Sequence, residues 1–249
     1  MIKFLHCALS ICVCLSSCEN KNIKSADSEV PGNRDAATKI DTVRNISTIE
    51  FQKGITPDQV LEKFKTGNKR FLENKMLHRD YLSQVDLSAQ GQHPYAVIIS
   101  CIDSRKPAEI IFDKGIGDMF NARIAGNFVN KDILGSLEFA CKVSGAKLIL
   151  VMGHSDCGAI KSACDHVELG NITAMLANIT PAVNAIPGFD KERTSANKVF
   201  VEAVARQNVI IAKDKIMKES PILREMVNKK EVIIEGCMYN LKNGTVEFY

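Results

Sequence analysis

Three residues in the middle of the chain have the types and spacing of metal ligands. Cys101 follows one apolar run, and His154 and Cys157 follow another. Two thiolates and an imidazole suit Zn2+ in tetrahedral geometry, and the three-residue spacing of His154 and Cys157 lets the start of one helix aim both at a single ion. Three protein ligands leave a fourth coordination position, which distinguishes catalytic zinc from closed structural zinc. The sequence therefore predicts a catalytic type of zinc centre.

Asp103 and Arg105 follow Cys101 so closely that they must lie near the same ion. With two thiolates and a neutral imidazole, bound zinc is formally neutral, and water bound to it becomes a hydroxide nucleophile when it loses a proton. Asp103 can accept a hydrogen bond from this hydroxide, or it can become a fourth metal ligand itself. Arg105 can hold the carboxylate in a bidentate pair and keep it off the metal. We expect the pair to orient the nucleophile or to switch the site between open and closed states.

Taken singly, each of these residues has an ordinary structural explanation. A lone cysteine is more often a buried core thiol, and a lone Asp–Arg pair is an ion pair of small consequence. The joint placement at two predicted strand ends favours the metal site. The chain has no Cys-x-x-Cys pair, which argues against a zinc ribbon or a thioredoxin-like motif. Cys141 is interpreted as a core thiol, and Cys164 and Cys237 as core or near-surface thiols.

Alternating strands and helices must position these ligands. Short apolar runs predict buried strands, and helical periodicity between them predicts helices, which together indicate an α/β fold with a mixed, mostly parallel central sheet flanked by helices. In such sheets, sites gather at the carboxyl ends of strands. The expected strands are 95–100, 119–124, 148–152, 231–237 and an edge strand at 245–249; the expected helices are 56–75, 132–143, 159–166, 172–185 and 195–218.

The N-terminus has the pattern of an export signal. Lys3 precedes an apolar run over 4–15 that is too short to span a bilayer permanently, and small residues follow. Leu15-Ser16-Ser17-Cys18 resembles the lipobox of bacterial lipoproteins, in which the cysteine carries the lipid. We therefore expect a signal peptide over 1–17, lipid attachment at Cys18, a polar tether over 18–55 and the functional domain over 56–249.

This organisation predicts an exported protein anchored to a bacterial membrane by lipid only, on the periplasmic side or at the cell surface. The net charge of +3 is too small to indicate nucleic-acid binding, and no basic stripe with interleaved aromatic residues is present.

The sequence resembles the β-carbonic anhydrase family between residues 56 and 240. Cys101-Ile102-Asp103-Ser104-Arg105 matches the family's Cys-x-Asp-x-Arg motif, and His154-Ser155-Asp156-Cys157 matches its His-x-x-Cys motif. Segments 117–120 (with Arg123), 125–127 and 135–140 follow the family pattern in the same order. The resemblance implies the reversible hydration of CO2 to bicarbonate and a proton, with one zinc ion per subunit.

The resemblance also implies a homodimer or homotetramer, with an N-terminal helical arm on a partner subunit and the pocket near the subunit interface. Gln92, Phe120 and Phe139 would then flank the CO2 site. One residue departs from the family: Lys106 stands where most members have an apolar residue, usually Val. In one subgroup that residue lines an inhibitory bicarbonate pocket beside a Trp. This chain has neither the apolar residue nor a Trp, which argues against that regulation. One interpretation is that Lys106 brings a cation near an anionic product.

Two other functions fit the same residues. The site would accept COS or CS2, because any linear electrophile of that size can approach the nucleophile. In a different class, a lipid-anchored zinc-binding protein would use the metal only for structure. The open coordination position and the adjacent Asp103–Arg105 pair argue against the structural alternative.

Overall fold

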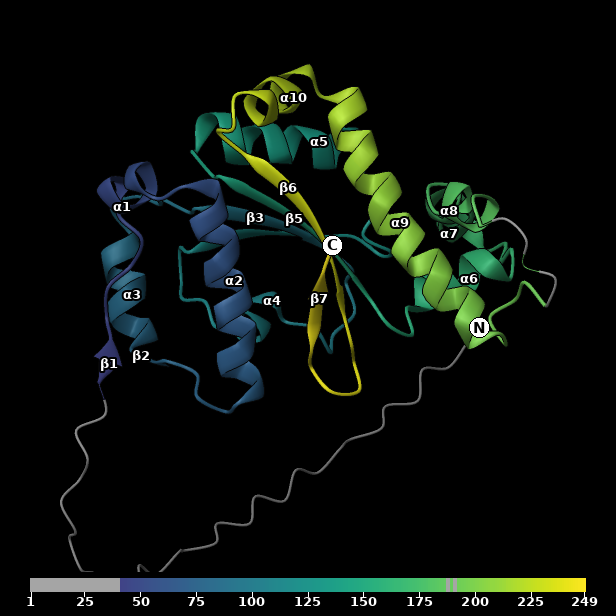
Figure 1. Ribbon diagram of the computed structural model, residues 1–249, viewed down its shortest axis with the longest axis horizontal. Coiled ribbons are helices and arrows are strands. Elements are labelled where there is room, and N and C mark those ends of the chain that lie inside the picture. Colours follow the sequence, from purple (N-terminus) through teal and green to yellow (C-terminus); the bar gives the residue numbers. More distant parts are fainter. Residues whose placement is uncertain (1–40, 187–188, 190–191) are drawn as a thin grey trace, which may run out of the picture. The chain divides into compact units, whose positions relative to one another are not determined.

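Five strands form the central sheet in the computed structural model, which describes residues 41–186, 189 and 192–249. The spatial order is β4 (Met119–Arg123), β3 (Ala96–Ser100), β5 (Leu148–His154), β6 (Ile233–Tyr239) and β7 (Val246–Phe248). The first four strands are parallel, and β7 pairs with β6 in the antiparallel direction (Figure 1). This confirms the predicted α/β fold with a mixed, mostly parallel sheet.

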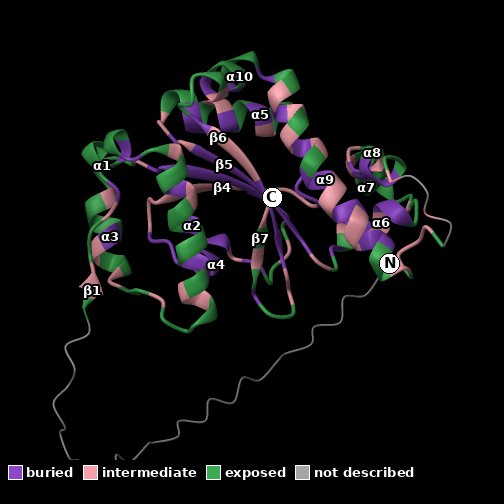
Figure 2. Cartoon of the chain, in the orientation of Figure 1, coloured by how far each residue is buried: buried purple, intermediate pink, exposed green. Residues whose placement is uncertain are grey.

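Helices cover both faces of this sheet because its central strands are apolar on both sides. Val97 and Ile99 of β3 belong to one core, and Ala96 and Ile98 belong to the other. Figure 2 shows the resulting band of buried residues along the strands. The first core is closed by α5 (Lys131–Glu138) with its π-helical extension (Phe139–Val143), α6 (Gly158–Cys164), α7 (Gly170–Leu176), α8 (Thr180–Asn184), α9 (Lys198–Glu219) and α10 (Pro221–Asn228).

The second core lies under α2 (Pro57–Leu72) and the short α4 (Ala108–Ile111). α2 begins where the sequence predicts. The Thr56 side chain accepts a hydrogen bond from the Gln59 N–H, and the Gln59 side-chain oxygen accepts one from the Thr56 N–H. Pro57 occupies the first turn. Val60 and Phe64 of α2 are fully buried in this core. α2 packs on the chain's own sheet, and the packing of an N-terminal helical arm on a partner subunit stays a prediction.

The ordered domain begins earlier than the sequence predicts. Residues 41–55, assigned to the tether, contain β1 (Thr42–Val43), which pairs with β2 (His78–Arg79), and α1 (Ile49–Gly54). Gln52 is buried, and its Nε2 donates to the carbonyl oxygens of Pro94 (2.7 Å) and Ser144 (2.6 Å). One compact unit therefore spans 40–249, and the predicted boundary at residue 55 is wrong because polar side chains anchor this segment.

Two other elements differ from expectation. The helix predicted over 172–185 is two helices, α7 and α8, and α8 starts at Thr180 with Pro181 in its first turn. Proline favours a helix start and disrupts a helix interior, which accounts for the break. α3 (Tyr81–Ser88) and α10 lie outside the ranges expected for helices.

The predicted signal peptide and Cys18 lie outside the described residues. Within 41–249, apart from the gaps near 190, no helix is long and apolar enough to cross a membrane.

Candidate metal centre

Strand register brings the three predicted ligands together. Cys101 directly follows β3, and His154 is the last residue of the neighbouring strand β5. Cys157 begins α6 after a tight turn in which Asp156 has a φ of 56°, a left-handed conformation that Asp tolerates. Cys101, His154 and Cys157 are 4%, 0% and 1% exposed. The sheet thus presents all three side chains at its carboxyl edge, away from water.

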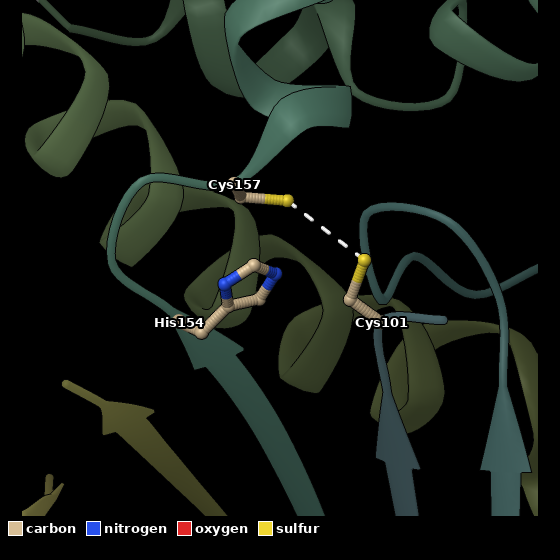
Figure 3. A group of neighbouring side chains, drawn as sticks. All are labelled: Cys101, His154 and Cys157. Carbon is tan, nitrogen blue, oxygen red and sulfur yellow. Dashed lines mark hydrogen bonds between the residues drawn. The ribbon is translucent and has the colours of Figure 1, made fainter. Parts of the chain in front are cut away.

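The ligand atoms of these residues lie within 4.8 Å of one another. The two Sγ atoms are 3.9 Å apart, and the imidazole points into the space beside them (Figure 3). His154 Nδ1 lies 2.9 Å from the carbonyl oxygen of Ser155. A carbonyl oxygen only accepts, so Nδ1 carries the proton and Nε2 carries the lone pair. Nε2 is buried and has no hydrogen-bond partner among the described residues. A buried polar atom without a partner is costly, and these donors fit Zn2+.

The two thiols are electrostatically unequal. The Cys157 thiol donates to Cys101 Sγ, which lowers the pKa of Cys101 and raises the pKa of Cys157; the Gly126 N–H, 3.4 Å from Cys101 Sγ, assists the first effect. The protein therefore favours one thiolate and one thiol in this pair. Because metal ions bind the thiolate form, a cation entering the group displaces the remaining proton.

Asp103 and Arg105 form the bidentate pair that the sequence predicts. Arg105 Nε lies 3.0 Å from Oδ1 and Nη2 lies 2.7 Å from Oδ2, and the Arg105 backbone N–H also donates to Oδ1 at 3.0 Å. These hydrogen bonds hold the pKa of Asp103 well below its usual range. The carboxylate is not part of the group of three converging ligand atoms. Metal ligation by Asp103 therefore stays a prediction.

Arg123 supports the loop between the ligand and the acid, a role that the sequence analysis missed. Its Nε donates to the Cys101 carbonyl oxygen at 3.1 Å, and its Nη2 donates to the Asp103 carbonyl oxygen at 2.5 Å. Arg123 ends β4 directly across from Ser100 in register, which places its guanidinium beside the Cys101–Asp103 loop. Arg123 lies near the end of the strand expected over 119–124, and this placement was the sequence feature that could have indicated its role.

The residues expected to flank the substrate lie elsewhere in this chain. Phe120 and Phe139 pack edge to face, with ring centroids 6.5 Å apart, in a hollow along β4 and α5. Gln92 is exposed in the loop that precedes β3, at the opposite end of that strand from Cys101. Among the described residues that line the hollow, none is a predicted metal ligand. The pocket roles of Gln92, Phe120 and Phe139 stay predictions.

Comparison with known proteins agrees with this geometry. Residues 96–246 match the family described as Carbonic anhydrase. The carbonic anhydrase of Mycolicibacterium smegmatis is 34% identical over 197 residues, covering 77% of this chain and 92% of that protein. Carbonic anhydrase 2 of Mycobacterium tuberculosis is 33% identical over 196 residues, covering 76% and 90%.

Solved structures support the fold. A tetrameric β-carbonic anhydrase from Sordaria macrospora aligns with a TM-score of 0.58 at 24% identity, covering 66% of this chain and 84% of that chain. A Coccomyxa β-carbonic anhydrase in complex with acetazolamide gives the same score and identity, covering 66% and 75%. The motifs, the converging ligands and these similarities lead to one assignment: the chain belongs to the β-carbonic anhydrase family.

Proposed function

We propose that this protein is a zinc-dependent carbonic anhydrase that catalyses the reversible hydration of CO2 to bicarbonate and a proton. The observation that carries the proposal is the buried group of Cys101, His154 and Cys157, in which His154 Nε2 lacks a partner among the described residues. The family supports the choice of substrate.

Cys101, His154 and Cys157 would hold the ion. When bound, zinc supplies a Lewis acid that makes water nucleophilic near neutral pH. The Ser155 carbonyl oxygen fixes the imidazole orientation through Nδ1, which is the usual way in which a second group orients a histidine ligand. The Gly126 N–H and the Arg123 guanidinium hold Cys101 from two sides, one through its sulfur and one through its carbonyl oxygen.

Asp103 would orient the attacking water rather than deprotonate it. Its hydrogen bonds from Arg105 keep the pKa low, so the carboxylate is ionised and weakly basic at neutral pH. An ionised carboxylate only accepts hydrogen bonds, so it fixes the direction of an O–H bond and hence of the lone pair that attacks carbon. Arg105 would keep the carboxylate in this role by occupying both of its oxygens.

A second copy of the chain would complete the substrate pocket. Phe139 is 52% exposed, although it lies beside Phe120 in a hollow at the β4 edge of the sheet. We propose that a homodimer or homotetramer covers this hollow and brings Gln92, Phe120 and Phe139 toward a metal centre.

Stopped-flow CO2 hydration by the full chain, with zinc content measured in parallel, tests the proposal. The wild-type protein should show a zinc-dependent rate, and Cys157→Ser should fall to the buffer rate while losing zinc. Parallel assays with COS and CS2 separate these substrates from CO2. Absence of a zinc-dependent CO2 rate at any pH between neutral and about 9 would rule out this function.

We also propose that the protein is exported and attached to a bacterial membrane through lipid on Cys18. The order of charge, apolar run and small residues before this cysteine supports the proposal. Cells fed labelled palmitate should incorporate label into the wild-type chain and not into Cys18→Ala.

A further inference from the structure

Lys106 is a fully buried lysine beside the metal centre. Its side chain is 0% exposed, and its Nζ donates to the Met152 carbonyl oxygen at 3.2 Å. Lysine is rarely buried without a charged partner, because an ammonium loses its hydration in the protein interior. Among the described residues, Lys106 forms no ion pair with a carboxylate. An apolar residue of similar length would fill the same space without this cost, so the charge itself requires an explanation.

The position of the ammonium connects it to both strands that carry metal ligands. Met152 precedes His154 by two residues on β5 and lies in register with Ser100, which immediately precedes Cys101 on β3. The hydrogen bond from Lys106 therefore reaches the backbone where the two ligand-bearing strands run side by side. Lys106 does not project into solvent, so its charge acts through the protein interior rather than by direct contact with a dissolved product.

The charges around Lys106 show what its ammonium can influence. Burial lowers the pKa of Lys106 to about 8, while the sulfur atoms of Cys101, Cys237 and Cys157 raise it and Arg123 lowers it further. Two of these three sulfur atoms belong to the metal-ligand group. A cation that interacts with the ligand sulfurs from inside the protein must also interact with any charged species bound between them.

We propose that Lys106 supplies a buried positive charge behind the metal centre that favours a small monovalent anion over a neutral ligand in the open coordination position. This inference rests on the proposed function, in which that position alternates between neutral water and anionic species. The two thiolates and zinc are together formally neutral, so an anion there makes the site negative. Lys106 offsets that charge without occupying the pocket. It acts through the ligands and is a positioning residue, not a catalytic one.

The size of the effect follows from Coulomb's law. For a separation of about 10 Å and an effective dielectric constant of about 20, a unit charge changes the affinity for a monovalent anion by about 20-fold. A neutral ligand should show almost no change. The ratio of the two affinities therefore separates the effect of charge from the effect of side-chain shape.

The test uses azide and imidazole as the anionic and neutral probes. Both are titrated into the cobalt-substituted full chain at pH 7 and constant ionic strength, where Lys106 is mostly protonated, and the visible absorption of cobalt reports binding. Lys106→Met keeps the length and removes the charge; it should raise the azide dissociation constant about 20-fold, leave that of imidazole unchanged and retain cobalt. Lys114→Met is the matched control, because Lys114 is also buried but its charged neighbours are Asp118, Lys63, Arg70 and Asp113, none of which is a metal ligand.

Three results would overturn the proposal: unchanged azide affinity in Lys106→Met, equal weakening of azide and imidazole, or loss of cobalt binding. The second and third would make Lys106 a structural support of the ligand group. The probes contain no CO2, so the measurement stands even where the hydration assay fails. A wild-type protein that binds azide in a Lys106-dependent way but does not hydrate CO2 would contradict the proposed function and keep this inference.

Discussion

Two buried polar groups in this protein differ in how many of their polar atoms have hydrogen-bond or ion-pair partners. At the carboxyl edge of the sheet, His154 Nε2 has no partner within the described chain, and the Cys101–Cys157 pair shares one weak hydrogen bond. Next to α2, the Asp113 carboxylate is also fully buried, but Arg70 and Arg79 pair with it and the Leu77 N–H donates to both of its oxygens.

The difference separates a ligand site from a structural anchor. Burial alone would raise the pKa of Asp113, but the hydrogen bonds from Arg79 and Arg70 outweigh burial and hold the pKa below its usual range. Both Asp113 oxygens have partners, so the group connects α2 and β2 to the domain and leaves no atom free to bind a ligand. The metal-ligand group has donors that converge on a shared space instead. Incomplete satisfaction, rather than burial or polarity, identifies the site that needs a ligand.

Replacement of Asp113 by Asn should have the largest effect on stability. Asp113 has a φ of 50°, which Asn also tolerates, so the variant removes the charge without straining the backbone. Two guanidinium groups lose their counter-charge, and we expect the free energy of unfolding in urea to fall by about 3 kcal/mol. The CO2 hydration rate per folded molecule should not change. Cys157→Ser should have the opposite result: activity is lost and the metal-free fold is retained. An equal loss of stability in both variants would contradict the distinction between a ligand site and a structural anchor.

Replacement of Arg105 by Met should affect activity and leave the fold almost unchanged, because the Arg105 side chain is 55% exposed. The variant removes both guanidinium hydrogen bonds to Asp103 and keeps only the bond from the Arg105 backbone N–H to Oδ1. We expect the hydration rate to fall about 10- to 100-fold, as for other groups that orient metal-site residues. The pKa of Asp103 should rise toward its ordinary value, which still leaves it ionised at neutral pH. The activity–pH profile should therefore keep its shape. An activity equal to that of the wild type would show that the pair has no orienting role.

The cobalt spectrum sharpens this second prediction. If Arg105 keeps Asp103 off the metal, the spectrum of the wild-type protein should change with pH together with activity. In Arg105→Met, a freed Asp103 that becomes a ligand should give a spectrum insensitive to pH. A wild-type spectrum that stays constant while activity changes with pH would exclude the proposed switch.

The sequence predicted the metal ligands because their signal is local. Cys101 and His154 each follow an apolar run, and parallel strands end at the same edge of a sheet, so adjacency in space follows from two short patterns. The helix start at Thr56 was equally local, since the cap, the proline and the capping glutamine lie within four residues. The sheet was predictable for the same reason: its strands are short, apolar and separated by helical periodicity.

The missed features depend on partners that are distant in the chain. Gln52 looks like part of a polar tether until its bonds to the Pro94 and Ser144 carbonyl oxygens are known. Arg123 contacts the site through backbone oxygens, which leave no sequence motif. Lys106 looks like a surface residue because lysine usually is one. In all three cases a polar side chain forms a hydrogen bond with a residue distant in the chain, and the hydrophobic periodicity of the sequence does not indicate such a contact.

The last prediction concerns Lys114, a buried cation in the core under α2. Its Nζ donates to the Lys63 carbonyl oxygen at 2.9 Å and lies 4.6 Å from the centre of the Phe64 ring. Burial lowers its pKa to about 7 from an ordinary value of 10.5, so between these values the unfolded chain binds more protons than the native protein. Stability should therefore rise with pH across this range, by at most about 1.4 kcal/mol per pH unit from this group. Lys114→Met should remove that part of the slope in urea unfolding measured between about pH 7 and 9.5. Curves that stay parallel for variant and wild type would show that Lys114 keeps its proton in the native protein, as a cation held by the aromatic ring and the Lys63 carbonyl.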